Sequence, residues 1–454
     1  MKHIKISLMV QKFLHSNDFD LIKTLLAESH HADVADALLI YNDTDIIRVL
    51  MATPIQERAE LFTHFSTSVQ HKLALALKPT DLGDLLAAMP HDDRADLYLG
   101  LPTSLKQLIN IQINPTEVDD MQHLSSYPED TAAAHMTTDF LYVRGDISAQ
   151  EAIRLTRQYG NSKETIYYIY VVDAGKKLLG VMSLRDLLLA DEQKPIHQIM
   201  RPNVVSIKAT TTPLEAAQTI AHYDLLSLPV VDELGVILGI ITADDAMDIQ
   251  AQSSEETLYK TGGLEISHGA NHLTMVNVKT ASIWTLYRMR VIWLVVLVFG
   301  NVFSGAGIAH FEDTIMSYVV LVFFLPLLID SGGNAGSQAA TLMVRGLATG
   351  EVILKDWGKM IGKEVLVALA LGLSMALAVA LVGFVRGGVE IAMVVALSMV
   401  CIVIIGSLIG LSLPFILSKL KFDPATASAP LITSIADIVG VLIYFSIATQ
   451  LLGL

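Results

Sequence analysis

Cysteine is almost absent from this chain of 454 residues: Cys401 is the single one, and it lies within an apolar run. One thiol cannot form a disulfide framework or a thiolate metal site within one chain, so any bound metal ion is expected to meet oxygen ligands. The amino-terminal stretch MKHIKISLMVQKFLHSNDFD also lacks an apolar core followed by a small-residue cleavage site. The sequence therefore predicts no secretory signal and a first half that stays in the cytoplasm.

Basic residues are scarce in the first half. Up to Met275 there are 21 Lys and Arg against 37 Asp and Glu, whereas the rest of the chain has 10 against 9. This acidity argues against nucleic-acid binding and indicates basic partners or divalent cations, unless it serves solubility alone. Hydrophobic runs of membrane-spanning length are also missing before Met275 and frequent after it. The sequence thus predicts a soluble half followed by a membrane half.

Five apolar runs are long enough to span a membrane, and they begin near Val291, Ile315, Ile361, Ile391 and Pro430. The connections on one side carry eight basic residues, Arg288, Arg290, Arg345, Lys355, Lys359, Lys363, Lys419 and Lys421, whereas the opposite side has only Arg386. The positive-inside rule then predicts a cytoplasmic amino terminus and an extracytoplasmic carboxyl terminus.

Two acids interrupt these apolar runs. Asp330 ends LVFFLPLLID, and Asp437 lies within PLITSIADIVGVLIYFSIA. An ionised side chain at the bilayer centre costs roughly 2.5 to 3.5 kcal/mol, so such residues mark an ion or proton path by default. The glycines that follow Asp330, Gly332 and Gly333 among them, predict a broken backbone, which is tolerated only inside protein or beside a polar cavity. Alternatively, both acids serve helix packing, with Asp330 bracing the broken helix.

Residues 2–125 show helical periodicity with a recurring D-x-x-D pattern, which indicates stacked helical hairpins. A single Asp of this kind is explained by helix capping. The cluster HDDRAD is denser than capping requires. Its acids Asp92, Asp93 and Asp96 are therefore candidate contacts for a divalent cation.

A second repeat, of roughly 55 to 65 residues, extends from about Ala134 to Gln250, and each copy has the order helix, strand, strand, helix. The second strand of each copy ends at a hydroxyl residue followed three positions later by an acid: Ser183 and Asp186, then Thr242 and Asp245. Such a pair is able to bind a ribose or a cation. Capping of the following helix explains the pattern equally well.

These copies resemble a tandem pair of CBS domains. The resemblance implies binding of an adenine nucleotide, with ATP as a candidate ligand. The residues that it implies are Ser183, Asp186, Thr242 and Asp245, with Tyr170 as a further candidate.

The whole chain resembles the MgtE family of magnesium channels, in which an acidic helical domain, a CBS pair, a connecting helix and five spans follow in this order. The resemblance implies a multidomain fold: an α-helical superhelical N domain, an α/β tandem CBS pair and an all-α transmembrane domain of five helices. The expected boundaries are 1–130 for the helical domain, 131–194 and 195–252 for the CBS repeats, 253–290 for the connecting helix and 291–454 for the membrane domain.

The same resemblance implies a homodimeric channel in the inner membrane that conducts Mg²⁺ and is closed by intracellular Mg²⁺. It places Asp437 at the ion site, with Gly332, Gly333 and Asn334 beside the pore. Acidic faces should repel one another when Mg²⁺ is scarce, and bridging ions should draw them together. We expect such bridges between Asp92, Asp93 and Asp96 on one side and Asp245 on the other, and between Glu255 and Glu256 and Asp423.

Other functions fit less well. A transporter of Co²⁺ or Mn²⁺ would use the same oxygen ligands and is the main alternative. An anion channel is expected to have Arg, Lys or helix N-termini facing its pore, and no predicted span has a basic residue near its centre. The sequence shows neither a nucleophile with a paired base, which would indicate an enzyme, nor a P-loop, which would indicate an ATP-driven pump. Coupling to Na⁺ or H⁺ is left open, and the expected partners are Mg²⁺, membrane lipid and a second copy of the chain, with no nucleic acid.

Overall fold

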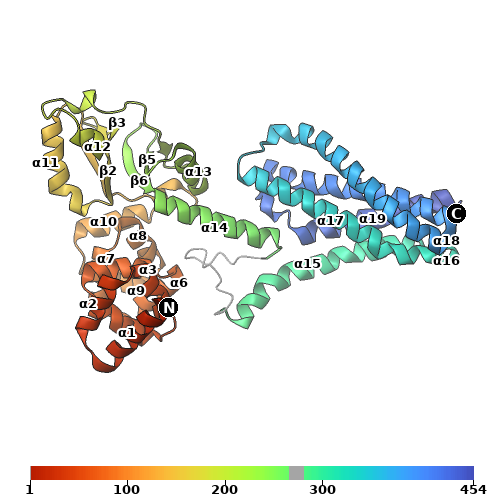
Figure 1. The fold of residues 1–454 in the computed structure, drawn as a ribbon, viewed down its shortest axis with the longest axis horizontal. Helices are drawn as coiled ribbons and strands as arrows, with labels where there is room; N and C mark the ends of the chain where they lie inside the picture. The colour runs from red at the N-terminus through yellow and green to blue at the C-terminus, as the bar shows by residue number, and fades with distance from the viewer. Residues whose placement is uncertain (1, 265–280, 454) are drawn as a thin grey trace. The chain divides into compact units, whose positions relative to one another are not determined.

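The computed structural model describes residues 2–264 and 281–453, with the side chains of residues 2–4 and 162 left out (Figure 1). The described residues form two compact units, residues 2–253 and residues 254–264 together with 281–453. The segment expected as a connecting helix falls partly outside the described residues: α14 (Ala243–Thr261) continues the second α/β repeat, and the next described helix begins at Ile283.

Ten short helices open the first unit. They are α1 (Lys2–Ser16), α2 (Phe19–Glu28), α3 (His31–Leu38), α4 (Asp43–Ala52), α5 (Ile55–Thr63), α6 (Thr67–Ala76), α7 (Pro79–Ala88), α8 (His91–Gly100), α9 (Thr103–Asn110) and α10 (Pro115–Leu124). From α1 to α10, each helix packs against the helix two places further along the chain. Helices this short are marginal alone, so their shared apolar core holds them. The predicted helical superhelix is confirmed.

Two similar α/β repeats follow. The first contains β1 (Phe140–Arg144), α11 (Ala149–Tyr159), β2 (Thr165–Val172), β3 (Leu178–Ser183) and α12 (Leu184–Leu188); the second contains β4 (Ile207–Lys208), α13 (Pro213–Tyr223), β5 (Ser227–Val231), β6 (Ile237–Thr242) and α14. In each repeat the first strand is parallel to the second, and the second is antiparallel to the third. The sequence predicted the two longer strands and missed β1 and β4.

The two repeats interlock. Thr137, at the start of the first, bridges to Ile240 in β6, and Arg201, at the start of the second, bridges to Val181 in β3. Buried side chains from both sheets, including Phe140, Tyr170 and Ile240, form one apolar cluster between them. The repeats are therefore halves of one folded module.

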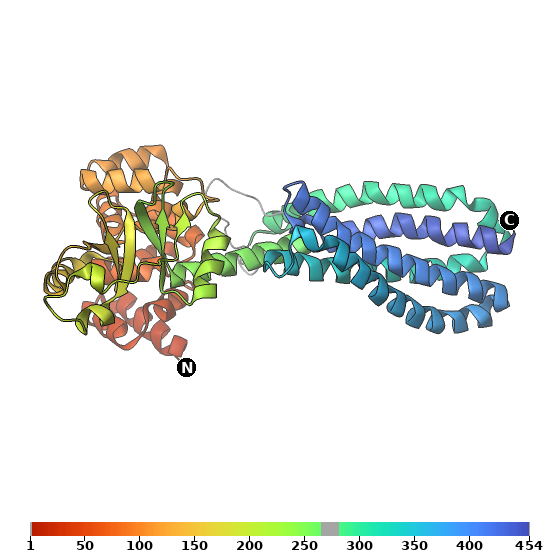
Figure 2. The same ribbon diagram turned by 90° about the horizontal axis from the view of Figure 1, so that it is seen from above.

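The second unit is built of long apolar helices: α15 (Ile283–His310), the short α16 (Glu312–Ser317), α17 (Val320–Ala348), α18 (Trp357–Lys419) and α19 (Ala429–Leu452). Figures 1 and 2 both show these long helices side by side. Short 3-10 turns in the two units are η1 (Ala132–His135), η2 (Gly160–Ser162), η3 (Ile196–Gln198), η4 (Leu354–Asp356) and η5 (Pro424–Thr426).

Helix α18 supplies two of the five predicted spans. Its backbone reverses at Gly388, whose φ of 76° and ψ of −167° suit glycine and little else. The two halves then pack antiparallel, with Gly383 against Ala392 and Gly372 against Val400. Four helices of the described chain are long and apolar enough to cross a membrane. Because α18 reverses at Gly388 and so contains two spans, these four helices provide five spans.

The expected break in the backbone after Asp330 is wrong, because α17 is one continuous helix through Gly332, Gly333 and Gly336. The glycines serve contact between helices instead. A Cβ on Gly406 of α18 would overlap the carbonyl oxygen of Gly332, and a Cβ on Gly410 would overlap that of Gly336. Two G-x-x-x-G motifs thus face each other, as is common where membrane helices approach closely.

We predict that Gly410→Ala separates α17 from α18, because the added methyl meets the backbone of Gly336 and no flexible side chain is available to yield. Overpacking of this kind costs about 1–3 kcal/mol. Thermal unfolding of the full chain in detergent should show a lower Tm. Gly362→Ala, on the same helix with nothing within 4 Å of the new methyl, is the matched control. An equal Tm for both variants would contradict the backbone contact.

Candidate functional site

The structure brings the two membrane acids together. Asp330 on α17 lies within electrostatic range of Asp437 on α19. Asn334, one turn after Asp330, donates from Nδ2 to Asp330 Oδ2 at 3.1 Å. Two carboxylates and an amide from two packed helices therefore form one polar site among apolar spans.

Glycine packing explains why these side chains meet. Gly332 lies against Ile402 of α18, and Gly333 lies against Thr433, one turn before Asp437 on α19. Adjacent glycines thus let α17 approach both neighbours. Because Gly332 and Gly333 are helical and buried, their carbonyls belong to the hydrogen bonds of the helix.

Oxygen ligands of this kind suit a hard divalent cation. Mg²⁺ keeps several waters and is usually held by one or two carboxylates, so a complete cage of protein ligands is unnecessary. Facing carboxylates also repel one another when no cation lies between them. The membrane site is chemically suited to a hydrated divalent ion.

A second acidic site lies in the first unit. Helix α8 begins after Pro90 without a side-chain cap, and Asp92 and Asp93 occupy its first turn. Burial, followed by the charge of Asp245, raises the pKa of Asp93 to about 7 and also raises that of Asp92. Asp96 adds to the negative charge around Asp93. The structure therefore brings together the acids that the sequence paired across α8 and α14.

Further acids that sequence reasoning missed enlarge this cluster. Burial and Asp245 raise the pKa of Glu164, just before β2, and burial and Asp244 raise that of Asp248. No motif marks Glu164 in the sequence. In the described part of the chain, no three His, Cys, Asp or Glu side chains gather closely enough to hold a metal ion. This arrangement suits a hydrated ion that carboxylates contact through water.

The nucleotide candidates are engaged in helix capping. Ser183 Oγ accepts from the backbone N–H of Asp186 at 3.0 Å, and the Asp186 carboxylate accepts in return from that of Ser183. In the second repeat, Thr242 Oγ1 donates to Asp245 Oδ2 at 2.5 Å. Both pairs thus fit the capping interpretation, and a ligand would compete with these bonds.

Tyr170 departs from the expectation for a nucleotide contact. Its side chain is 1% exposed, and its hydroxyl lies 2.8 Å from Ser227 Oγ, between the two sheets. A ring enclosed in this core cannot reach a bound nucleotide, so the structure assigns Tyr170 to the packing of the two repeats.

A lysine that the sequence did not single out lies among the acids of α14 and η5. Lys260 Nζ is 2.6 Å from Asp423 Oδ2 and also pairs with Glu256. Burial alone would lower the pKa of Lys260, but Asp423 and Glu256 raise it. Glu255 instead interacts with Tyr259. The protein's own cation thus lies where a bridging divalent ion was expected.

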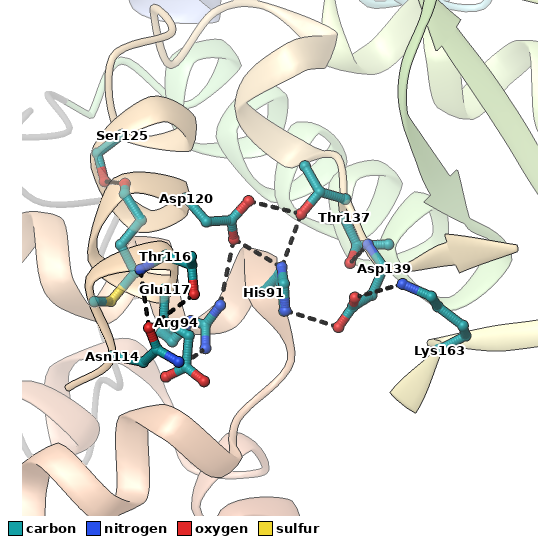
Figure 3. Close-up of polar contacts among 12 residues, drawn as sticks. His91, Arg94, Asn114, Thr116, Glu117, Asp120, Ser125, Thr137, Asp139 and Lys163 are labelled. Atoms are coloured by element: carbon teal, nitrogen blue, oxygen red, sulfur yellow. Dashed lines mark hydrogen bonds and ion pairs between the residues drawn. The ribbon is translucent and has the colours of Figure 1, made fainter. Parts of the chain in front are cut away.

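His91 forms a second such cationic contact, drawn in Figure 3. Its Nδ1 is 2.7 Å from Asp120 Oδ2, and its Nε2 is 2.7 Å from Asp139 Oδ2. Burial by itself lowers the pKa of His91, but hydrogen bonds to Asp120 and Asp139 outweigh burial and raise it to about 9. The sequence marked His91 only as the start of HDDRAD.

Comparison with known proteins identifies the family. Residues 325–447 match the family model MgtE, described as a divalent cation transporter; residues 29–130 match the MgtE intracellular N domain; residues 132–192 and 196–251 match the CBS domain. The magnesium transporter MgtE of Thermus thermophilus is 38% identical over 332 residues, which are 73% of this chain and 72% of that protein. The chain belongs to the MgtE family.

Another MgtE relative, the magnesium transporter MgtE of Bacillus subtilis, is 34% identical over 72% of this chain and 71% of its own length. Two solved structures resemble the first unit and cover 99% of their own chains. The soluble part of a magnesium transporter is 27% identical over 56% of this chain with a TM-score of 0.52. The cytosolic domain of the Mg²⁺ channel MgtE in complex with ATP is 33% identical over 54% with a TM-score of 0.51.

These MgtE matches confirm the family and the fold class that the sequence predicted: a helical domain, a CBS pair and a membrane domain of apolar helices. A family of divalent cation transporters is also consistent with a protein that is not an enzyme.

The acidic cluster around Asp93 predicts a dependence of stability on pH. The pKa of Asp93 in the folded chain, about 7, lies above its ordinary value of 3.8. Stability from this group is therefore present at low pH and lost as the pH rises towards and through 7. In EDTA, the Tm of the full chain should fall between about pH 5 and 8, and Asp93→Asn should lessen the fall and raise the Tm at pH 8 by at least about 2 °C.

Asp119→Asn, an exposed acid on α10, serves as the control and should leave the profile unchanged. A profile in Asp93→Asn identical to that of the wild type would show that Asp93 is not under electrostatic strain.

Proposed function

We propose that this MgtE chain conducts Mg²⁺ into the cell and is closed by intracellular Mg²⁺. The observation that carries the proposal is the meeting of Asp330, Asn334 and Asp437 among apolar helices. The names of the relatives, which are magnesium transporters, support Mg²⁺ as the ion.

The ion site gains most in a homodimer. One Asp437 supplies a single negative charge, whereas a twofold axis along the pore would place two of them opposite each other and match the charge of Mg²⁺. Asn334 and Asp330 would then accept hydrogen bonds from the waters that the ion keeps. Each chain of the proposed homodimer would thus contribute one Asp437, and so half of the ion site.

Regulation follows from the cluster of Asp92, Asp93, Asp245 and Glu164. When Mg²⁺ is scarce, these carboxylates repel and weaken the contact between the helical domain and the CBS pair. When Mg²⁺ is abundant, hydrated ions between them restore the contact, and the channel closes. Glu256 and Asp423 respond less to Mg²⁺, because Lys260 already neutralises part of their charge.

Orientation and energy source complete the proposal. The eight basic residues of the connections on one side support a cytoplasmic amino terminus and a carboxyl terminus outside the inner membrane. Mg²⁺ then enters down the membrane potential, gaining about 4.6 kcal/mol per 100 mV. The same oxygen ligands would also bind Co²⁺ or Mn²⁺, which is the second candidate function.

ATP is the proposed ligand of the CBS pair, on the basis of the relative solved in complex with ATP. Ser183, Asp186, Thr242 and Asp245 would contact it after exchanging their capping bonds.

We predict that Asp437→Ala lowers Mg²⁺ influx into proteoliposomes at least about tenfold, because one charge of the site is lost from each chain. The wild type should lose its influx when internal Mg²⁺ is stepped from micromolar to about 10 mM. Asp313→Asn, exposed on α16 outside the apolar spans, is the control and should conduct normally. Undiminished influx in Asp437→Ala would remove this acid from the ion path.

A separate prediction concerns Asp245, which belongs to both the acidic cluster and the candidate nucleotide site. Asp245→Asn should weaken ATP binding to the full-length protein and also change the Mg²⁺ concentration that closes it. Asp186→Asn should weaken ATP binding alone, since no acid of α8 acts on it. Titration calorimetry with ATP and the influx assay measure the two effects. If Asp245→Asn alters neither the ATP affinity nor the Mg²⁺ concentration that closes the channel, the shared role of Asp245 is contradicted.

A further inference from the structure

We propose that His91 is a built-in cation that fastens the helical domain to the first CBS repeat without Mg²⁺, and that it thereby lowers the Mg²⁺ concentration needed for closure. This inference rests on the proposed function. We call the contact of His91 with Asp120 and Asp139 the His91 bridge.

The geometry requires a charged imidazole. Asp120 belongs to α10 of the helical domain, and Asp139 immediately precedes β1 of the first repeat. Each of the two carboxylates lies 2.7 Å from a different ring nitrogen of His91. A neutral imidazole has one N–H, so its other ring nitrogen would present a lone pair to one of these carboxylates, and the two would repel each other. Only imidazolium donates to both.

The charges around the bridge are balanced, unlike those of the neighbouring acidic cluster. Arg94, whose residue is 1% exposed, lies 3.3 Å from Asp120 and 3.8 Å from Glu117. Lys163 lies 3.2 Å from Asp139. Three cations thus face three acids around the junction (Figure 3), and of these contacts the pair His91–Asp139 joins the helical domain to the first repeat. Removing one partner from such a partly buried network leaves an uncompensated charge and weakens the contact.

The bridge also fixes the position of the regulatory acids. His91 is the first residue of α8, and Asp92 and Asp93 follow it directly. A bridge from His91 to Asp139 therefore holds the first turn of α8 where its acids face Asp245 and Glu164. Because all its partners are side chains of this chain, the bridge needs no bound ion. Mg²⁺ then needs to offset only the remaining repulsion.

His91→Gln tests the inference, because glutamine has a single amide group and cannot place a charge between two carboxylates. In full-length protein in proteoliposomes, the internal Mg²⁺ concentration for half-closure should rise roughly tenfold or more, as expected for one lost charged hydrogen bond. Influx at micromolar internal Mg²⁺ should stay unchanged. Lys72→Gln breaks an ion pair of 2.8 Å within the helical domain and should leave both values unchanged.

A second readout does not depend on transport. In EDTA, limited proteolysis of the full-length chain should cut residues 125–138, between α10 and β1, faster in His91→Gln than in the wild type. Adding Asp139→Asn to His91→Gln should slow the cleavage again, because it removes the one acid that His91→Gln leaves in excess and restores two cations, Arg94 and Lys163, to two acids, Asp120 and Glu117. If His91→Gln fails to fold, Asp139→Asn alone carries the same expectations with a smaller effect.

The outcomes separate this inference from the proposed function. Wild type that conducts and closes, with an unchanged half-closure concentration in His91→Gln, overturns the His91 bridge. Wild type that does not close with Mg²⁺ overturns the proposed regulation, and proteolysis then decides about the bridge: equal cleavage of the wild type and the variant in EDTA would refute it.

Discussion

Repulsion between facing carboxylates is the constraint on which the rest of this structure depends. It acts at two separate places, between Asp330 and Asp437 in the membrane domain and between Asp93 and Asp245 in the first unit. Each pair unites acids from elements that must pack for the fold to exist. Such packing is favoured when a cation intervenes or a proton binds, which is the arrangement expected of a protein that responds to ions.

The protein neutralises some of its acids and leaves others. Lys260 pairs with Glu256 and Asp423, and His91 pairs with Asp120 and Asp139. These contacts use cations of the protein itself and need no added ion. Asp92 and Asp93, by contrast, lie among other acids, Asp245 first of all, whose charges raise their pKa values. A mobile cation therefore has its largest effect there, which is what a sensor of ion concentration requires.

Sequence patterns predicted most of the fold, because they rest on long-range periodicity: stacked helices, two α/β repeats and five spans. They also named the two membrane acids and the acids of α8 and Asp245, since an acid in an apolar run or a dense acidic cluster is conspicuous. They failed where a contact depends on a distant partner. Gly332 and Gly336 suggested a broken helix, because their partners Gly406 and Gly410 lie 74 residues away on another helix.

The same reason explains the other errors. Tyr170 matched a nucleotide contact in the sequence, but its burial depends on how the two sheets pack. Lys260, Glu164 and Asp139 carry no motif, and only the fold shows which charges they face. Strand β4 escaped prediction because a strand of two residues has too few positions to show alternation.

Hydrogen–deuterium exchange of the full-length protein in lipid nanodiscs, with EDTA or with about 10 mM Mg²⁺, tests the central claim most directly. If unneutralised carboxylates weaken the contact between the helical domain and the CBS pair, Mg²⁺ will slow exchange in the first turns of α8 and α14 and leave α1 and α2 unchanged. Equal exchange of α8 and α14 in both conditions would contradict the account.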